Sequence, residues 1–295
     1  MRIHESELIL NKDGSIYHLN LLPEDVADTV LVVGDPDRVP QVSCYFDRIE
    51  VRKQKRELVT HTGYIGKKRI SVISTGMGVG GIDIAINELD ALANIDFKTR
   101  TINSTLKSLQ IIRLGTAGAL QKEVPVDSMV VSHRGLGFDG LAGFYEIKYN
   151  DEETRLTQQV LEKFNHHPAV LSCYIAEGDP TLLNLFGSKE AIVGTTVTSS
   201  GFYAAQGRVL RGQLQIKDFI EKLQQLNMTN FEMETSLLYA LGKILGHRMS
   251  SVCAIVANRA TQEFSKEPTE AVDSTIRFVL EKLSSVPVQE ILVQA

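Results

Sequence analysis

Residues 29–38 read TVLVVGDPDR. The first part, Thr29–Val33, is apolar or β-branched at every position, which predicts a strand that is buried on both faces of a sheet. Gly34 ends this run, and Pro36 suits the first turn of a helix that follows. A strand of this kind that leads through a short turn into a helix is typical of α/β proteins with a parallel sheet.

Similar apolar runs recur along the chain and alternate with amphipathic segments. We expect further strands at Arg69–Ser74, Gln110–Leu114, Ser128–Val131, Ala191–Thr198 and Ser251–Ala257. We expect helices over residues 82–95, 237–245 and 272–283, where apolar side chains recur on one helical face. The prediction is therefore an α/β fold with one domain over residues 1–295, in which helices flank both faces of a central mixed, mostly parallel sheet.

One polar segment interrupts this pattern. Asp96–Leu109 is rich in Thr and Ser and separates a predicted helix from a predicted buried strand. We expect it to be an inserted surface loop.

Charge and composition argue against several classes of function. The net charge of −5 provides no overall positive field for a nucleic acid partner. No apolar run approaches the roughly 18 residues that a membrane span needs. The first residues lack the apolar core of a signal peptide, so we expect a cytoplasmic protein. Cys44, Cys173 and Cys253 show no metal-ligand or disulfide spacing and are predicted to be small buried residues.

Two glycine-containing turns follow predicted strands. After the first strand, Gly34 and Arg38 suit either an anion site at a helix N-terminus or an ordinary turn with a solvated arginine. After the second, residues 76–81 (GMGVGG) match the GxGxxG pattern of dinucleotide sites, with Asp96 20 residues beyond Gly76. The acid of such a site ends a second strand, however, whereas residues 82–95 predict one uninterrupted helix. Close approach of the backbone to another ligand, or helix packing, explains these glycines better than a nicotinamide cofactor does.

Three charged residues lie in apolar surroundings. Arg113 is inside a predicted buried strand, and because an unpaired buried guanidinium is costly, it should face either an anion or a carboxylate. Glu232 and Glu234 open an apolar helix, where two carboxylates at this spacing diverge, so only one is expected to point into a given pocket. The alternative is that both are acids favoured at a helix N-terminus.

Together these segments resemble a known family. Five motifs run in the order of the nucleoside phosphorylase-I family, most similar to its uridine-cleaving bacterial members, over about residues 17–285: GDPDR at 34–38, STGMG at 74–78, RLGTAG at 113–118, EME at 232–234 and NR at 258–259. The resemblance implies a pentosyltransferase that cleaves a pyrimidine nucleoside, uridine, with inorganic phosphate. Phosphate is then a co-substrate, and no organic cofactor is required.

The resemblance also assigns roles to residues. It implies a phosphate site formed by Gly34, Arg38, Arg56, Arg113 and Thr116. It implies ribose contacts from His18, Met233 and Glu234, with His18 and Arg56 lent to the site of a neighbouring subunit. It implies a uracil pocket formed by Phe202, Gln206 and Arg208, with Arg259 ordering that pocket. Catalysis is then expected to depend mainly on Arg113, Glu234, Arg208 and His18.

The chain departs from the family pattern in three places. Gly81 falls where some members have a serine that helps to hold a monovalent cation, so we expect no metal site, although Glu57 is a possible ligand. Ala117 stands where a second threonine is usual. The insertion at 96–109 has no counterpart in the bacterial pattern. We expect a homo-oligomer with a dimer as the catalytic unit, and a hexamer is the alternative assembly.

Other functions stay open at this point. Purine-cleaving relatives carry an aspartate after the last core strand, where this chain has Asn258 and Arg259, so a purine nucleoside phosphorylase is the less favoured enzyme. A nucleosidase would use water and would not need several arginines around an anion. A non-catalytic nucleoside-binding relative is the third alternative.

Overall fold

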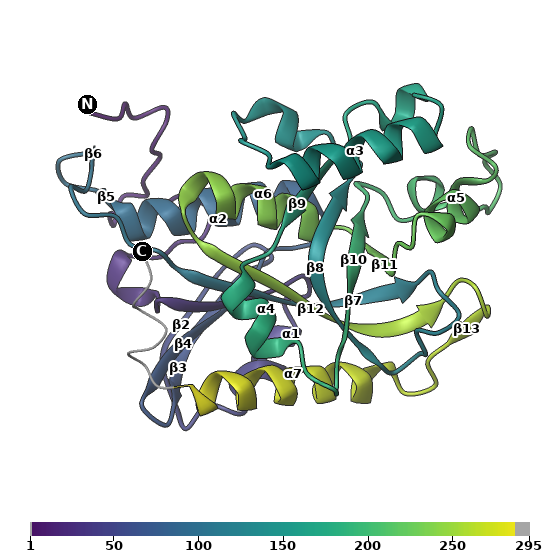
Figure 1. The fold of residues 1–295 in the computed structure, drawn as a ribbon. Coiled ribbons are helices and arrows are strands. Elements are labelled where there is room, and N and C mark those ends of the chain that lie inside the picture. Colours follow the sequence, from purple (N-terminus) through teal and green to yellow (C-terminus); the bar gives the residue numbers. More distant parts are fainter. Residues whose placement is uncertain (1, 287–295) are drawn as a thin grey trace.

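The structure, a computed structural model, describes residues 2–286 of the chain (Figure 1). It confirms the predicted α/β class, because a mixed sheet lies between helices on both faces. The main sheet contains β1 (Thr29–Val33), β2 (Arg48–Lys55), β3 (Leu58–Ile65), β4 (Lys68–Ser74), β7 (Gln110–Ala119), β8 (Met129–Gly137), β9 (Tyr174–Glu177), β10 (Ile192–Thr198), β11 (Asn230–Glu232), β12 (Arg248–Asn258) and β13 (Glu263–Phe264).

The strands are ordered β13-β12-β8-β10-β11-β7-β1-β4-β3-β2 in the sheet, and β9 pairs with β8. The predicted strands supply parallel pairs, such as β1 with β4 and with β7. The strands that were not predicted add mainly antiparallel pairs, among them β2–β3, β3–β4 and β12–β13. Antiparallel pairing therefore has a larger share of the sheet than the sequence indicated.

Seven helices cover this sheet within residues 2–286: α1 (Arg38–Ser43), α2 (Val79–Asn94), α3 (Asp151–Lys163), α4 (Pro180–Phe186), α5 (Phe219–Gln225), α6 (Thr235–Leu245) and α7 (Pro268–Ser285). Short 3-10 turns occur at η1 (Pro23–Asp25), η2 (Leu141–Phe144), η3 (Pro168–Val170) and η4 (Ala204–Gln206). Figure 1 shows α2 and α6 on one side of the sheet and α7 on the other. None of these helices combines the length and the apolar character that crossing a bilayer requires.

The unbroken apolar run of β1 has a direct structural reason. Val30 and Val32 pack into the core beneath α2 and α6, whereas Leu31 and Val33 pack into the core beneath α1 and α7. Successive residues of a strand point to opposite faces, so both faces of β1 are apolar because both are covered.

Strand β7 changes its neighbour halfway along its length. Its first half pairs with β1 as far as the Val33–Leu114 pair, and its end pairs with β11 through Gly118 and Ala119. Along its other edge it pairs with β12 throughout. The pairings β7–β12, β12–β8, β8–β10, β10–β11 and β11–β7 close into a ring, so one part of the sheet is an open sheet and the other a small barrel.

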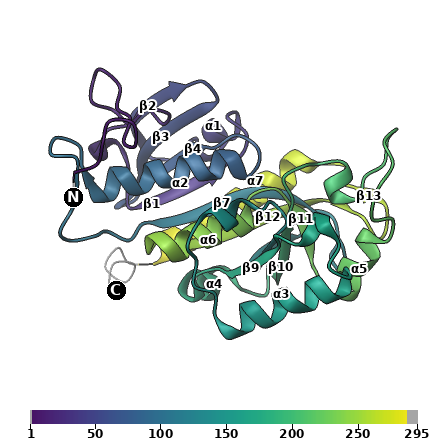
Figure 2. The same cartoon turned by 90° about the horizontal axis from the view of Figure 1, so that it is seen from above.

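The segment 96–109 is more ordered than the predicted surface loop. It contributes to a hairpin of β5 (Ile95–Asp96) and β6 (Thr101–Ile102), and its last residue, Leu109, is buried. The hairpin holds the N-terminal segment, because Arg100 donates from Nε to the Ile3 carbonyl at 3.1 Å and also donates to the Leu8 carbonyl. A polar sequence does not indicate such contacts between an arginine side chain and the backbone of a distant segment, so they could not be predicted. Figure 2 shows the hairpin loop beside the N-terminus.

Three local predictions need correction. The helix after β1 begins at Arg38 rather than at Pro36, because the residues between form a turn. Strand β7 continues to Ala119 instead of ending at Leu114, since β12 pairs with it over this whole length. Cys44 is exposed, because it lies at the end of the short helix α1, whereas Cys173 and Cys253 are buried as expected.

The glycine-rich segment 76–81 does not open a dinucleotide-binding unit. Helix α2 follows it without interruption and leads into the hairpin strand β5, which pairs antiparallel with β6. The acid of a dinucleotide site ends the second parallel strand of its unit, whereas Asp96 lies in this antiparallel hairpin. The structure thus agrees with the prediction that these glycines serve another purpose.

Candidate active site

A cavity of about 950 Å³ opens where β1 and β4 end and where β7 changes from β1 to β11. It brings together most of the residues that the sequence singled out. Its lining includes Gly34, Arg38, Glu57, Arg113, Thr116, Phe202, Gln206, Arg208, Met233, Glu234 and Arg259. Two predicted site residues, His18 and Arg56, do not line it.

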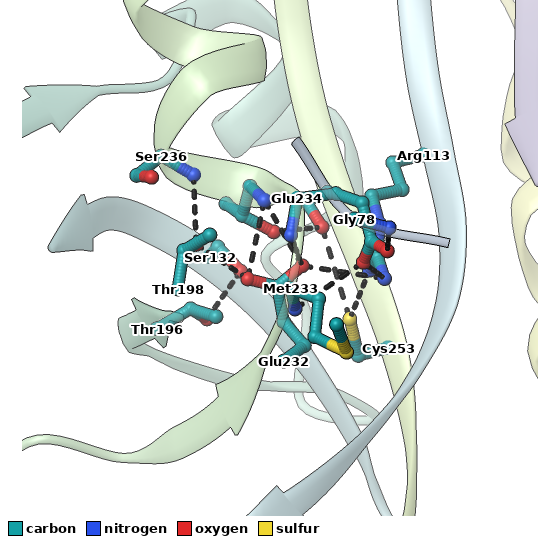
Figure 3. Close-up of polar contacts among 12 residues, drawn as sticks. Gly78, Arg113, Ser132, Thr196, Thr198, Glu232, Met233, Glu234, Ser236 and Cys253 are labelled. Carbon is teal, nitrogen blue, oxygen red and sulfur yellow. Dashed lines mark hydrogen bonds and ion pairs between the residues drawn. The ribbon is translucent and has the colours of Figure 1, made fainter. Parts of the chain in front are cut away.

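The side chain of Arg113 lies against Glu232, Glu234 and Cys253 (Figure 3). Its Nη2 forms an ion pair with Glu234 and lies 3.2 Å from Glu232 Oε2. Its Nη1 donates to the Sγ atom of Cys253 at 3.0 Å. Burial works to lower the pKa of Arg113, but the two carboxylates outweigh it and raise the pKa, so the guanidinium stays charged.

Glu232 is held by donors on several sides. Its carboxylate accepts from Thr198 Oγ1 at 2.5 Å and from the backbone N–H groups of Glu234 and Thr235, each at 2.9 Å. Burial raises the pKa of this carboxyl, and the charge of Arg113 opposes that rise. With these donors in place, Glu232 fixes the start of α6 as well as the position of Arg113.

The prediction that only one of the two glutamates points into the pocket is wrong. Glu232 is the last residue of β11, and Glu234 is the N-cap of α6, so the two do not share a helix. The turn between them directs both carboxylates to Arg113. Both glutamates line the cavity.

Two glycines make this arrangement possible. A Cβ atom on Gly115 would lie 1.9 Å from Arg113 Nη1, so the guanidinium folds over a position that has no side chain. Gly78, at φ +89°, donates its N–H to Glu234 Oε1 at 2.6 Å. The glycine-rich turn after β4 therefore serves to bring the backbone close to a carboxylate.

Gly81 has a packing role in the same turn. A Cβ atom there would lie 2.0 Å from the carbonyl oxygen of Thr75, so α2 approaches the end of β4 only without a side chain at this position. The serine that some family members have here does not fit this backbone. Within residues 2–286, no three His, Cys, Asp or Glu side chains gather as a metal site would require. Glu57 lies exposed at the cavity.

One end of the cavity contains a partly buried arginine without an ion-pair partner in the described residues. Arg38 donates to the Leu114 carbonyl at 3.3 Å and forms no ion pair with a carboxylate in residues 2–286. Burial lowers the pKa of Arg38, and the nearby charge of Arg113 lowers it further. Gly34 and Thr116 line the same cavity. An anion bound beside Arg38 would relieve the repulsion between the two guanidinium groups.

The other end of the cavity combines an aromatic ring, an amide and two guanidinium groups. Gln206 is buried, and its Oε1 accepts from Arg208 Nη1 at 2.5 Å. The Arg208 guanidinium lies 3.9 Å from the centre of the Phe202 ring. Arg259 donates to the backbone carbonyl of Gln206 at 3.1 Å, which orders the loop. Burial lowers the pKa of Arg208 to about 10, and the charge of Arg259 adds to this effect.

Asn258, beside Arg259, has a structural role. It is buried, and its side-chain amide donates to the carbonyls of Gln121 at 2.9 Å and Val124 at 2.7 Å. Its Oδ1 accepts from the Ala260 and Thr261 N–H groups. The amide of Asn258 is thus engaged in holding the backbone around it, and this residue supplies no carboxylate beside Arg259.

The two predicted residues that do not line the cavity, His18 and Arg56, lie in segments that contact each other. Arg56 is in the turn between β2 and β3, with φ +55°, and its neighbour Lys55 donates to the carbonyl of Tyr17 at 2.5 Å. Tyr17 directly precedes His18. The N-terminal segment and the β2–β3 turn thus present His18 and Arg56 from one part of the surface.

Sequence reasoning assigned no site role to two groups in this centre. Glu232 was singled out by the Glu-Met-Glu pattern, but its contact with Arg113 depends on the turn from β11 into α6. Cys253 carried no signal, since it meets Arg113 only because β12 places it opposite Gly115 of β7.

The sequence is similar to those of known proteins over most of its length. The model of the phosphorylase superfamily matches residues 28–292. The chain is 32% identical to the uridine phosphorylase of Thermococcus kodakarensis over 86% of this chain and 82% of that protein. It is 29% identical to the uridine phosphorylase of Haemophilus influenzae over 87% and 91%, respectively. It is also 24% identical to a purine nucleoside phosphorylase of Bacillus velezensis over 83% and 89%.

The fold is also shared with solved structures. A Trypanosoma brucei nucleoside phosphorylase, described as showing uridine phosphorylase activity, superposes with a TM-score of 0.86 at 27% identity. The match covers 95% of this chain and all of that chain. The same arrangement of strands and helices therefore supports a nucleoside phosphorylase in a protein of related sequence.

Proposed function

This chain belongs to the phosphorylase superfamily, and from that premise we propose that it cleaves uridine with inorganic phosphate to give uracil and ribose 1-phosphate. One observation carries the proposal. A single cavity holds Arg38, which forms no ion pair in residues 2–286, the two carboxylates of Glu232 and Glu234, and the amide and guanidinium groups of Gln206 and Arg208. These suit, in turn, a phosphate, a sugar with its hydroxyl groups, and a base with carbonyl oxygens. The protein is an enzyme of the pentosyltransferase class.

Phosphate binding is assigned to Arg38, Arg113, Thr116 and the backbone of Gly34. Arg38 has no carboxylate partner in residues 2–286, so its charge is available to an anion. A guanidinium group binds phosphate oxygens through two parallel hydrogen bonds, which holds the nucleophile in one orientation. Such positioning supplies a large part of the rate in a displacement reaction.

Ribose binding is assigned to Met233 and Glu234. Glu234 is fixed by Gly78 and Arg113, so its carboxylate is ready to accept hydrogen bonds from sugar hydroxyls. In the reaction, a phosphate oxygen forms a bond to C1′ as the bond from C1′ to N1 of uracil breaks. The sugar carries positive charge in between, and the bound phosphate and the buried carboxylates stabilise it.

Binding of the leaving group, uracil, is assigned to Phe202, Gln206 and Arg208. As the glycosidic bond breaks, its electron pair stays with uracil and spreads over the two carbonyl oxygens. Arg208 is a charged donor that suits these oxygens, and Gln206 offers an amide beside it. The proton that phosphate loses when it becomes an ester balances the one that uracil gains.

His18 and Arg56 are proposed to complete the site of a neighbouring subunit. Neither lines the cavity of its own chain, yet both lie in one part of the surface, linked by the Lys55–Tyr17 contact. A homodimer in which each subunit lends this part of its surface would bring a third arginine to phosphate and a histidine to the ribose 5′-hydroxyl.

The direct test is incubation with uridine, with and without phosphate, followed by detection of free uracil. We expect uracil only when phosphate is present, and Arg208→Ala should lose most of the activity. Uracil release without phosphate would indicate a nucleosidase. Uridine binding with no uracil under either condition would indicate a non-catalytic relative.

A second measurement separates pyrimidine from purine use. The base end has no acid from Asn258, and its buried polar groups would be left unpaired by a purine, so we expect kcat/KM for uridine to exceed that for inosine by about 10⁴. Comparable values would contradict the pyrimidine assignment but not the use of phosphate.

A further inference from the structure

We propose that Glu88 is a positioning residue, which fixes the proton of His18 on Nδ1 so that Nε2 faces the ribose 5′-hydroxyl as a hydrogen-bond acceptor. This inference rests on the proposed function, because it concerns the histidine that completes the ribose site. Glu88 lies on α2, outside the cavity lining.

The contacts of Glu88 converge on one short segment. Its Oε1 lies 2.7 Å from His18 Nδ1. The same carboxylate accepts from the backbone N–H of His18 at 3.0 Å and from that of Leu19 at 2.7 Å. The Glu88 side chain is only 13% exposed, whereas that of His18 is 31% exposed. The carboxylate is thus the buried anchor and the imidazole is its outward-facing partner.

These contacts determine which nitrogen of His18 carries the proton. An ionised carboxylate only accepts hydrogen bonds, so the imidazole must donate from Nδ1. In the neutral ring, Nε2 then has a free lone pair and acts as an acceptor. Nε2 has no partner within residues 2–286. An acceptor of this kind suits a hydroxyl group that donates its proton.

The segment that carries His18 is held in place on its other side. Lys55 donates to the Tyr17 carbonyl, and its ammonium lies 4.3 Å from the centre of the Tyr17 ring. Asn11 donates to the Ile16 carbonyl at 2.8 Å. The backbone that precedes His18 is therefore held independently of Glu88, whereas the imidazole and the N–H groups of His18 and Leu19 are held by Glu88 itself.

The variant Glu88→Gln tests this arrangement. Gln keeps the size of the side chain and an oxygen for the backbone donors, but its NH₂ group favours an acceptor at His18 Nδ1 and so moves the proton to Nε2. We expect kcat/KM for uridine to fall about tenfold, the size of one hydrogen bond. For 5′-deoxyuridine, which lacks the hydroxyl in question, we expect a change of less than about twofold.

Two further variants make the result specific. His18→Ala should likewise lower kcat/KM for uridine and leave that for 5′-deoxyuridine nearly unchanged. Adding Glu88→Gln to His18→Ala should cause no further loss, because the two residues act through one contact. Asp90→Asn is the matched control, since it removes a carboxylate from α2 that pairs with His247 and not with His18. Asp90→Asn should leave the ratio of kcat/KM for uridine to kcat/KM for 5′-deoxyuridine unchanged.

Equal losses on uridine and 5′-deoxyuridine in Glu88→Gln would show that Glu88 only maintains the fold, and would overturn the proposal. Nitrogen NMR of the wild-type imidazole gives a readout that does not depend on activity or on folding of the variant. We expect the proton on Nδ1, and a proton on Nε2 would refute the proposal. If the wild-type protein has the proton on Nδ1 but does not cleave uridine, the proposed function fails while the positioning by Glu88 stands.

Discussion

Arg38 and Arg113 line the same cavity but have different neighbours. We therefore expect replacement of Arg38 to affect mainly phosphate binding and replacement of Arg113 to affect the stability of the fold as well. Arg38→Ala removes a cation that forms no ion pair within residues 2–286. Hydrogen bonds to charged groups are worth about 1.5–3 kcal/mol, so we expect the KM for phosphate to rise tenfold or more. The free energy of unfolding should fall by less than about 1 kcal/mol. Steady-state kinetics and urea unfolding measure the two quantities.

Arg113→Ala is the comparison. It leaves the buried Glu232 and Glu234 without their cation, so we expect an additional loss of about 3–5 kcal/mol in the free energy of unfolding. A phosphate KM for Arg38→Ala within about twofold of wild type would show that Arg38 does not bind phosphate.

At the residue scale, the sequence predicted what kind of group would face Arg113 but not which residues would supply it. The buried position of Arg113 required an anion or a carboxylate, and the structure provides two carboxylates beside an open cavity. The contact with Cys253 depends on the alignment of β7 with β12, which local sequence does not determine. Local sequence likewise does not show that the Arg113 guanidinium folds over Gly115, where a side chain would collide with it.

At the element scale, the end of β7 gives a further prediction. Gly115→Ala would place a Cβ atom 1.9 Å from Arg113 Nη1, so the guanidinium must move away from Glu234. We expect kcat/KM for phosphate to fall by at least about tenfold, because charge-assisted hydrogen bonds of Arg113 are lost. Thermal unfolding and phosphate kinetics of the variant measure the effect. Gly80→Ala is the control, as a Cβ atom there meets nothing within 4 Å. Equal kinetics for the two variants would contradict the role given to Gly115.

The sequence predicted β1, which has both faces covered, and missed β2, which lies at the edge of the sheet. Strand β1 has an unbroken apolar run because helices pack on both of its faces. Strand β2 reads RIEVRKQK and alternates between exposed and half-exposed positions at the edge of the sheet. It is held by its pairing with β3 rather than by burial of its side chains, so hydrophobicity gives no signal for it. The short strands β5 and β6 are missed for the same reason.

At the scale of the whole molecule, the proposed exchange of residues between subunits is testable by mixing variants. Arg56→Ala and Arg38→Ala each damage every site in a homodimer. In a mixed dimer, one site has its own Arg38 and receives Arg56 from the other subunit, so it is intact. We therefore expect the mixture, at low phosphate, to exceed the mean activity of the two parents after subunit exchange.

The control mixes Arg38→Ala with the double variant Arg38→Ala/Arg56→Ala, in which no combination restores a site. No gain in the first mixture, although mass spectrometry detects mixed dimers, would show that Arg56 acts within its own chain or not at all. A monomer with full activity would also contradict the shared site. Only the family resemblance predicted this arrangement, because His18 and Arg56 lie apart in the chain and residue patterns do not connect them. In the structure their neighbours Tyr17 and Lys55 are in contact.

Because β7 changes its partner strand, the residues assigned to phosphate and those assigned to the base lie on different groups of strands. Of the cavity groups assigned to phosphate, Gly34 and Arg38 follow β1, Arg113 lies where β7 pairs with β1, and Thr116 lies just beyond that pairing. Groups assigned to the base follow β10 and β12, which belong to the barrel. Evolution can therefore rewrite the loops of the barrel to accept another base while the half that handles phosphate is inherited unchanged.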